Sequence, residues 1–490
     1  MKSIVLAFSF FILTRMGFGQ SEPIRLNSEN PHYFHYKGKT LALITSAEHY
    51  GAVLNADFNF EKYLPTLKSE GMNYTRIFMG SYFEIPSKSF GIKNNTLAPN
   101  QGKAIVPWNS VMENGTGKYD WSSYNPAYFE RLKAFMTVAD ELDIIVEITL
   151  FSSIYNDDHW EMNPQNPKNR IGAEGSLDYK MAHTTENGQL LGLQKSYVRK
   201  LVEELNGFDN FFFEIQNEPW ADRGLPVLNI ANKHGIGGPD WVEKVDLADQ
   251  LSLDWQEQIA EVIATTEDDL PKKHLIAQNY SNFQAPLSNI SDHISILNFH
   301  YNWPESAGQN YHWNRVIGFD ESGFAGSEDM VYRRQAWAFM MSGGGLFNNL
   351  DYSFFAGKED GTGQNEAPGG GSTALRKQLS ILAGFMNELD LEKVKPDDQA
   401  ILGAPGLLTY ALSDGLGGWA IFASEAGERE SKLIIEAKDG SIYSIESINP
   451  LTGEIMSLGN ISAKNNELRI PVKLESGEIA LRVKPLLSTK

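Results

Sequence analysis

A buried β-strand is predicted by the run Phe211-Phe212-Phe213-Glu214-Ile215-Gln216-Asn217-Glu218-Pro219-Trp220. Its aromatic and apolar first half is typical of such a strand. The strand is expected to end before Pro219, which has no amide hydrogen for a sheet ladder. Asn217 and Glu218 then stand at the carboxyl end of the strand, where an α/β barrel gathers its functional side chains.

A second run repeats this design: Arg315-Val316-Ile317-Gly318-Phe319-Asp320-Glu321-Ser322-Gly323 has a short apolar strand that ends in a carboxylate. Successive side chains of a strand point to opposite faces, so if Glu321 faces inward, Asp320 is expected to face the helices or a loop. Glu214 precedes Glu218 by four residues and is expected to point into the barrel. It is interpreted as a structural carboxylate, with Arg76 as one candidate partner.

Alternating strands and helices fill the sequence between about residues 40 and 391. A parallel sheet with helical crossovers is the fold that such alternation favours. Eight units of this length predict a closed (β/α)8 TIM barrel of the α/β class. The expected strands are 40–46, 73–79, 143–150, 211–217, 274–278, 294–299, 315–321 and 345–350.

Three segments are expected along the chain. Residues 1–19 read as a signal peptide, with Lys2, an apolar run over 4–13 and Gly17-Phe18-Gly19 before the cut. Residues 20–395 form the barrel with an N-terminal β-hairpin. Residues 396–490 contain short alternating runs separated by glycine turns, which predict a C-terminal β-sandwich that packs on the barrel.

The composition limits the possible binding partners and the cellular compartment of the protein. The 490 residues carry a formal net charge of −20, which argues against nucleic acid and anionic membranes as partners. Cysteine is absent, so disulfides and thiolate metal sites are excluded. No segment after the signal is long and apolar enough for a transmembrane helix. We expect a secreted or periplasmic protein; its oligomeric state stays open.

Glu218 and Glu321 have the properties of a pair that cleaves glycosidic bonds. Such cleavage needs two carboxyl groups beside one bond, one protonated and the other ionised. The two glutamates stand on the fourth and seventh expected strands, nearly opposite each other across the barrel mouth. A surface salt bridge is the simpler interpretation of either residue alone, whereas the pair favours catalysis.

These motifs resemble the retaining glycoside hydrolases of clan A, in particular the cellulase and mannanase-like family five. The resemblance covers roughly residues 40–391. It rests on Asn217-Glu218-Pro219, on Glu321 at the end of strand seven, and on Gly71-Met72-Asn73-Tyr74-Thr75-Arg76. His300-Tyr301 also resembles the family's His and Tyr, although the usual one-residue gap between them is missing. Which of the two reaches the nucleophile is therefore left open.

The resemblance implies a role for each residue. Glu218 is expected to be the acid/base and Glu321 the nucleophile of a retaining β-glycoside hydrolase, with their carboxyls about 5–5.5 Å apart. Asn217 is expected to bind the 2-hydroxyl of the sugar. Arg76 is expected to keep Glu321 ionised. His300 or Tyr301 is expected to orient the nucleophile.

Aromatic residues and histidines after the strands are further candidates for carbohydrate binding. Trp160, Trp220 and Trp303 could stack on sugar rings, with core packing as the alternative for each. His49 is also placed among the substrate-binding residues. The histidine spacings match no metal-ligand motif, so we expect neither a metal nor another cofactor.

Two other functions use the same features. A non-catalytic glycan-binding barrel is one, although the presence of both glutamates argues against it. A transglycosylase is the other, and it would employ the same two glutamates. The leading prediction is hydrolysis of a poly- or oligosaccharide by double displacement; the sugar and the linkage are not predicted.

Overall fold

The structure is a computed structural model that describes residues 22–113, 116–231, 243–364, 366–425, 430–474 and 476–486. The predicted signal peptide, residues 1–19, lies outside these ranges. Within the described ranges, no helix has both the length and the apolar character needed to cross a membrane.

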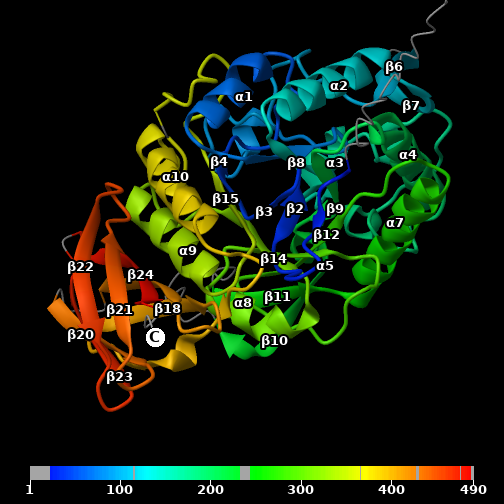
Figure 1. The fold of residues 1–490 in the computed structure, drawn as a ribbon. Helices are drawn as coiled ribbons and strands as arrows, with labels where there is room; N and C mark the ends of the chain where they lie inside the picture. Colours follow the sequence, from blue (N-terminus) through cyan, green and yellow to red (C-terminus); the bar gives the residue numbers. More distant parts are fainter. Residues whose placement is uncertain are drawn as a thin grey trace, which may run out of the picture.

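Eight parallel strands form a nearly closed barrel, as predicted (Figure 1). Each strand pairs in parallel with its neighbour in the order β4, β15, β14, β13, β12, β9, β8, β5. Their bounds are β4 (Leu43–Ala47), β5 (Tyr74–Phe78), β8 (Ile145–Ser152), β9 (Phe211–Asn217), β12 (Ile276–Asn282), β13 (Ile296–His300), β14 (Val316–Ser322) and β15 (Leu346–Leu350). The seam between β4 and β5 is bridged by the Asn73 amide, which accepts from the Ile44 amide nitrogen at 2.9 Å and donates to the Ala42 carbonyl at 2.9 Å.

The helices surround the barrel. Amphipathic spacing predicts most of the longer ones; in α1, for example, Tyr63, Leu64 and Leu67 are buried against the sheet. The helices are α1 (Phe60–Ser69), α2 (Pro126–Glu141), α3 (Asp157–Met162), α4 (Leu190–Leu205), α5 (Pro219–Arg223), α7 (Gln250–Asp268), α8 (Glu305–Asn310), α9 (Asp329–Met341) and α10 (Thr373–Asn387). Short 3₁₀ helices are η1 (Pro86–Lys88), η2 (Pro167–Asn169), η3 (Tyr179–Met181), η4 (Tyr311–Trp313) and η5 (Asp398–Ala400).

Two antiparallel strand pairs are added to the eight strands of the barrel. No strand was expected between residues 79 and 143, but this segment contains a β-hairpin, β6 (Trp108–Glu113) and β7 (Thr116–Tyr124). Trp108 and Trp121 stack on each other within the hairpin at 3.9 Å between ring centroids. Both rings also contact Tyr197 of α4, at 4.8 and 6.2 Å, which holds the hairpin on the barrel. A second antiparallel pair, β10 (Gly224–Ala231) and β11 (Lys244–Ala248), extends the sheet beyond β12.

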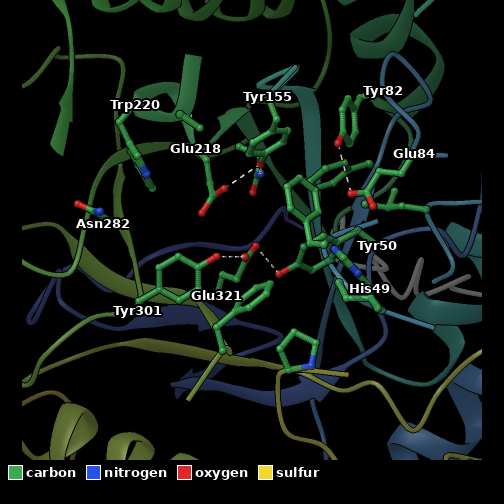
Figure 2. A pocket seen from close by; sticks show the side chains of 18 of the residues that line it. His49, Tyr50, Tyr82, Glu84, Tyr155, Glu218, Trp220, Asn282, Tyr301 and Glu321 are labelled. Carbon is green, nitrogen blue, oxygen red and sulfur yellow. Dashed lines mark hydrogen bonds between the residues drawn. The ribbon is translucent and has the colours of Figure 1, made fainter. Parts of the chain in front are cut away.

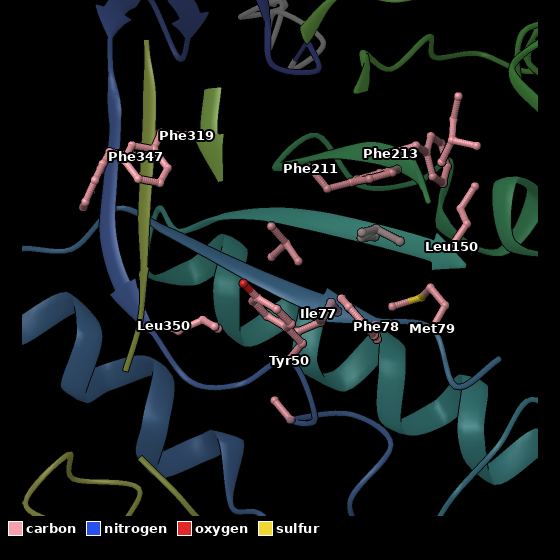
Figure 3. Close-up of a cluster of buried hydrophobic side chains, with 14 of the residues drawn as sticks. Tyr50, Ile77, Phe78, Met79, Leu150, Phe211, Phe213, Phe319, Phe347 and Leu350 are labelled. Carbon is pink, nitrogen blue, oxygen red and sulfur yellow. The ribbon is translucent and has the colours of Figure 1, made fainter. Parts of the chain in front are cut away.

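Apolar residues close the amino-terminal end of the barrel. One residue from each barrel strand joins this layer: Leu43, Tyr74, Ile145, Phe212, Ala277, Ile296, Val316 and Leu346. The layer packs on Ile24 and Phe34 from an N-terminal sheet of three strands, β1 (Arg25–Leu26), β2 (Phe34–Tyr36) and β3 (Lys39–Leu41). Phe211 and Phe213 belong instead to the large core that includes the surrounding helices (Figure 3). The aromatic run therefore supplies both faces of β9.

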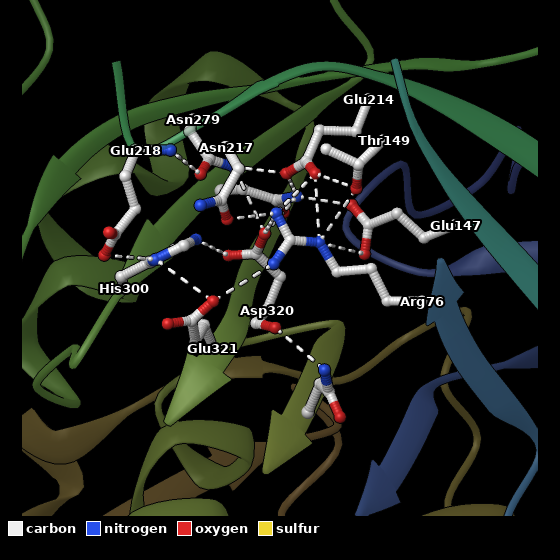
Figure 4. A network of polar contacts seen from close by, with 12 residues as sticks. Arg76, Glu147, Thr149, Glu214, Asn217, Glu218, Asn279, His300, Asp320 and Glu321 are labelled. Atoms are coloured by element: carbon white, nitrogen blue, oxygen red, sulfur yellow. Dashed lines mark hydrogen bonds and ion pairs between the residues drawn. The ribbon is translucent and has the colours of Figure 1, made fainter. Parts of the chain in front are cut away.

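Polar residues fill the barrel directly above the apolar layer (Figure 4). They stand two positions further along each strand, as the alternation of a strand requires: Thr45, Arg76, Glu147, Glu214, Asn279, Asn298, Gly318 and Asn348. Gly318 is needed here, because a Cβ atom at this position would lie 2.1 Å from Oδ1 of Asn298. This layer forms a buried polar floor under the carboxyl ends of the strands.

The C-terminal region is a β-sandwich, as predicted. One sheet has the order β16-β18-β19-β24-β21-β22 and the other the order β17-β20-β23. The strands are β16 (Lys395–Pro396), β17 (Ile401–Gly403), β18 (Leu407–Ser413), β19 (Trp419–Glu425), β20 (Glu430–Glu436), β21 (Ile442–Ile448), β22 (Ile455–Ser462), β23 (Glu467–Lys473) and β24 (Glu478–Leu486). The sandwich lies against α9 and α10 (Figure 1), where the rings of Trp337 and Phe422 stack at 5.6 Å.

Replacing Glu478 is expected to destabilise the contact between barrel and sandwich. Its buried carboxylate accepts two hydrogen bonds from Arg333, at 2.6 and 2.9 Å, and one from Arg334 at 3.0 Å. Glu478→Ala leaves the buried Arg333 charge uncompensated, which costs about 3–5 kcal/mol. Chemical denaturation of the full chain measures the loss. Glu467→Ala, which removes an exposed ion pair with Arg469 on the same sandwich, should cost about 1 kcal/mol or less.

Candidate active site

A pocket of about 590 Å³ opens at the carboxyl ends of the barrel strands (Figure 2). Glu218 and Glu321 both line it. So do aromatic and apolar side chains from the segment after β5, among them Tyr82, Phe90 and Leu97. Both glutamates therefore line one pocket at this end of the barrel.

Glu218 is held from three sides. It is the N-cap of α5 and has a left-handed backbone with φ 48°, which is unusual for glutamate and lifts it out of the strand. Tyr155 donates its hydroxyl hydrogen to Oε2 of Glu218 at 2.8 Å, and Nδ1 of His300 lies 3.0 Å from Oε1. The Glu218 amide donates to Oδ1 of Asn279 at 3.1 Å. This carboxyl has a fixed position above the polar floor.

Glu321 accepts hydrogen bonds from three residues. The Tyr301 hydroxyl donates to Oε1 at 2.8 Å, and the Tyr50 hydroxyl donates to Oε2 at 3.0 Å. Nη1 of Arg76 donates to Oε2 at 3.3 Å. The open choice between His300 and Tyr301 is thereby answered: Tyr301 makes the direct hydrogen bond, and Nδ1 of His300 lies 3.7 Å from Oε2.

The two glutamates face each other. A carboxylate oxygen of Glu218, a carboxylate oxygen of Glu321 and a ring nitrogen of His300 all lie within 4.8 Å of one another. Figure 2 shows the two carboxyl groups directed into the same space. One sugar ring can therefore contact both groups at once.

Asp320 points into the barrel, contrary to the expectation that it faces outward. Strand alternation from Val316 through Gly318 already directs Asp320 inward. The register between β13 and β14 then shifts after Phe299 and Phe319, so that His300 pairs with Glu321. Such a bulge inserts one extra residue and redirects side chains. Both Asp320 and Glu321 therefore face the barrel axis.

Arg76 connects the pocket with the polar floor (Figure 4). It contacts Glu321 and donates to Oδ1 of Asn217 at 2.8 Å. Its Nε also donates to Glu214 at 3.0 Å, which confirms the predicted partner of that carboxylate. Its Nη2 lies 3.5 Å from Oδ2 of Asp320. Fully buried and surrounded by acids, the guanidinium has a pKa raised further by Glu214, although burial alone lowers it.

The pKa values of the two glutamates shift in opposite directions. Burial raises the pKa of Glu218, but the hydrogen bond and charge of His300 outweigh it and bring the pKa below its usual range. Burial raises the pKa of Glu321, and the charge of Glu218 adds to the rise, while His300 and Arg76 offset only part. These shifts are the reverse of those that the predicted roles require.

The other predicted substrate-binding residues divide into two groups. Asn217, Trp220, Tyr301 and His49 line the pocket. Trp160 and Trp303 are not among the described lining residues. Trp160 is buried and donates its indole hydrogen to the Leu177 carbonyl at 2.8 Å, and Trp303 packs on Phe283 at 5.9 Å between ring centroids.

Two tyrosines that hold the glutamates were assigned no role from the sequence. Tyr50 follows β4 and Tyr155 follows β8, so both leave the same edge of the barrel as Glu218. Both have a left-handed backbone, with φ 59° and 69°. Their position just after a strand is the signal that could have found them. Asp222 fixes the second loop by accepting the amide hydrogens of Ile154 and Tyr155 at 2.7 and 2.8 Å.

Solved glycoside hydrolases share this fold. A family 5 glycoside hydrolase from Bacteroides vulgatus aligns with a TM-score of 0.58 at 11% identity, over 94% of this chain and 93% of that chain. A proposed glycoside hydrolase from the same organism gives 0.63 at 11% identity, over 96% and 83%. A third structure, named glycoside hydrolase, gives 0.60 at 13% identity, over 96% and 98%. No family model and no curated protein matches the sequence. The resemblance predicted from the motifs is confirmed at the level of the fold.

Proposed function

We propose that the chain is an exported retaining β-glycoside hydrolase that cleaves a poly- or oligosaccharide. Three features support the proposal: the glycoside hydrolase fold, the facing pair Glu218 and Glu321, and the predicted signal peptide. Among these, the approach of two carboxyl oxygens to within 4.8 Å carries the most weight. Retaining enzymes need so short a separation, because the nucleophile must reach the anomeric carbon with no water between.

In the first step, the Glu321 carboxylate attacks the anomeric carbon and forms a glycosyl ester, while Glu218 gives a proton to the departing oxygen. In the second step, Glu218 takes a proton from a water molecule while the water oxygen attacks the anomeric carbon. This attack cleaves the glycosyl ester and restores the Glu321 carboxylate. Tyr50, Tyr301 and Arg76 aim three donors at Glu321. They favour its ionised form and hold it in the attacking position.

The opposite pKa directions of Glu218 and Glu321 depend on what lies between the two carboxyls. Two carboxyls this close titrate as a pair that shares protons, so the location of a proton depends on what else lies in the pocket. A sugar that fills the space between them excludes water and separates the two charges. The proposal requires that the bound sugar shifts the proton to the Glu218 side of the pair.

The direct test of this function is product stereochemistry. The purified protein is screened on aryl β-glycosides and polysaccharides, and the first sugar released is followed by proton NMR. We expect the β-anomer to form first and to mutarotate later. Initial release of the α-anomer would contradict the retaining mechanism, and binding without any product would instead support a glycan-binding barrel. Addition of an acceptor alcohol or sugar measures transfer against hydrolysis.

The pocket should reject sugars that carry a negative charge. Its described lining contains four carboxyl residues (Glu84, Glu218, Asp246 and Glu321) and neither Lys nor Arg. A substrate carboxylate would therefore be desolvated without a compensating cation. We expect kcat/KM for an aryl β-glucuronide to be about 100-fold below that for the matching glucoside, equivalent to about 2.7 kcal/mol. The aryl β-xyloside, which lacks the C6 group altogether, controls for the loss of contacts at that carbon.

A further inference from the structure

The residue before the predicted nucleophile has a partner that the glycosidase proposal does not use. Asp320 is fully buried, and its Oδ1 lies 3.4 Å from Nε2 of His300. This is an ion-pair contact, since neither of these two buried atoms forms a hydrogen bond within the described residues. The other carboxylate oxygen, Oδ2 of Asp320, accepts hydrogen bonds from the side chains of Asn279 and Asn298, each at 3.1 Å. Nε2 of His300 is therefore a nearby cationic group for this otherwise unpartnered Asp320 oxygen.

His300 connects this aspartate with Glu218. Its Nδ1 lies 3.0 Å from Oε1 of Glu218, on the side of the ring opposite to Asp320. The ring is completely buried and the Trp220 ring meets it edge-on at 5.3 Å between centroids, which keeps water away. An imidazole that faces a carboxylate at each nitrogen satisfies both of them only when it carries two N–H groups.

We propose that Asp320 and His300 form a proton store for Glu218: Asp320 holds His300 as an imidazolium, and Nδ1 of that imidazolium supplies the proton that Glu218 passes to the leaving oxygen. This inference rests on the proposed glycosidase function. Asp320 is a positioning residue in it, because it acts through His300 and touches no substrate.

The proton transfer balances over the two steps. As the glycosidic bond breaks, the N–H bond at Nδ1 of His300 breaks and an O–H bond forms at Oε1 of Glu218, which then donates to the leaving oxygen. His300 is left neutral, with its remaining hydrogen on Nε2 towards Asp320. When water attacks the glycosyl ester, Glu218 takes a proton from the water and returns it to Nδ1 of His300.

The charges around His300 agree with this assignment. Glu218 faces it from the start of α5, Asp320 and Glu321 face it from β14, and Arg76 from β5 lies behind Asp320. Burial lowers the pKa of His300, but Asp320 and Glu321 outweigh burial and raise it well above the usual range. The lowered pKa of Glu218 follows from the same contact with His300. The proton that Glu218 would donate as the acid is therefore held by Nδ1 of His300, which is in hydrogen-bond contact with Oε1 of Glu218.

The first experiment reads the protonation state directly and needs no turnover. Nitrogen-detected NMR of the histidine side chains in the full chain should show one imidazolium at pH 7 that resists titration, and His300→Gln should remove its signals. In Asp320→Asn the same ring should be neutral at pH 7, because burial then outweighs the remaining acids once the largest of the charges that raise its pKa is gone. A neutral His300 ring in the unsubstituted protein at pH 7 would overturn the proposal.

The second experiment uses leaving groups. Asp320→Asn should lower kcat/KM for aryl glycosides with poor leaving groups by about 100-fold, and leave 2,4-dinitrophenyl glycosides nearly unchanged, since these need no proton. The imidazolium is lost as the pH rises through a lowered pKa, so the alkaline limb of the profile should move to lower pH. If kcat/KM fell equally for all leaving groups, the proposal that Asp320 and His300 store a proton for Glu218 would be contradicted. A chain without any glycosidase activity would defeat the proposed function alone, because the NMR result stands independently.

Glu147→Gln is the matched control for a change of charge in the polar floor. Glu147 is as buried as Asp320 and accepts a hydrogen bond from Asn298 at 2.7 Å, but it has no contact with His300. This variant should leave the His300 signals and the alkaline limb in place. His300→Asn keeps a donor near Glu218 without a titrating ring, and it should lose activity on poor leaving groups even where Asp320→Asn fails to fold.

Discussion

Glu321→Ala should abolish hydrolysis while the fold stays intact. The Tyr50, Tyr301 and Arg76 donors meet at its carboxylate, so the substitution removes the group that they hold in the attacking position. We expect kcat to fall by about 10⁴-fold or more, measured with a 2,4-dinitrophenyl β-glycoside so that protonation of the leaving group does not limit the rate. Circular dichroism and denaturant unfolding check the fold.

Azide gives this variant a sharper readout. It fits the space that the carboxylate leaves and attacks from the same face, so Glu321→Ala with azide should yield the α-glycosyl azide. Glu214→Gln is a suitable comparison, since Glu214 is a buried glutamate that contacts Arg76 beneath the pocket but does not line it. Full activity of Glu321→Ala, or a β-glycosyl azide from it, would show that another group is the nucleophile.

Glu218→Ala should lose activity in proportion to the need for a proton. For leaving groups such as sugars or unactivated phenols, we expect kcat/KM to fall by about 10²–10⁴-fold, the usual contribution of general acid catalysis. For 2,4-dinitrophenyl glycosides, the first step should proceed and the glycosyl ester should accumulate, because no base remains to activate water. A burst of dinitrophenol followed by a slow steady state measures this.

Azide again separates the two glutamates. In Glu218→Ala it replaces water on the opposite face of the sugar from Glu321, so the product should be the β-glycosyl azide. Tyr155→Phe serves as the control, because it removes one hydrogen bond to Glu218 and leaves the carboxyl itself in place. It should show a much smaller loss. A uniform loss in Glu218→Ala across all leaving groups would argue against its role as the acid.

The barrel could be predicted from the sequence because each of its strands and helices is specified mainly by the apolar and polar residues within that element. Phe211–Asn217, whose aromatic first half predicted a buried strand, forms β9, and Leu346–Leu350 forms β15 within the range expected for the last strand. The hairpin β6–β7 was missed for the opposite reason. In its first strand, Trp108–Glu113, only Trp108 is buried, and what holds the hairpin is the contact of Trp108 and Trp121 with Tyr197 of α4.

Within the site too, some residues could be predicted from the sequence and others could not. Glu218, Glu321 and Arg76 were found from the sequence, since each stands in a recognisable motif near a strand end. The direction of Asp320 was predicted wrongly, because a one-residue bulge in β14 lets two consecutive acids face the barrel axis. Pairing between strands decides such a bulge, and one strand alone does not contain that information.

The amino-acid sequence by itself determined the strand and helix succession, the acidic residues at the ends of β9 and β14, and the separate β-sandwich, because these follow from hydrophobic periodicity and chain stops. Only the tertiary structure decided that Tyr50 and Tyr155 hold the two glutamates, and that Asp320 meets His300. Those contacts join residues up to 271 positions apart. They depend on strand register and on left-handed turns, which are fixed when the barrel closes.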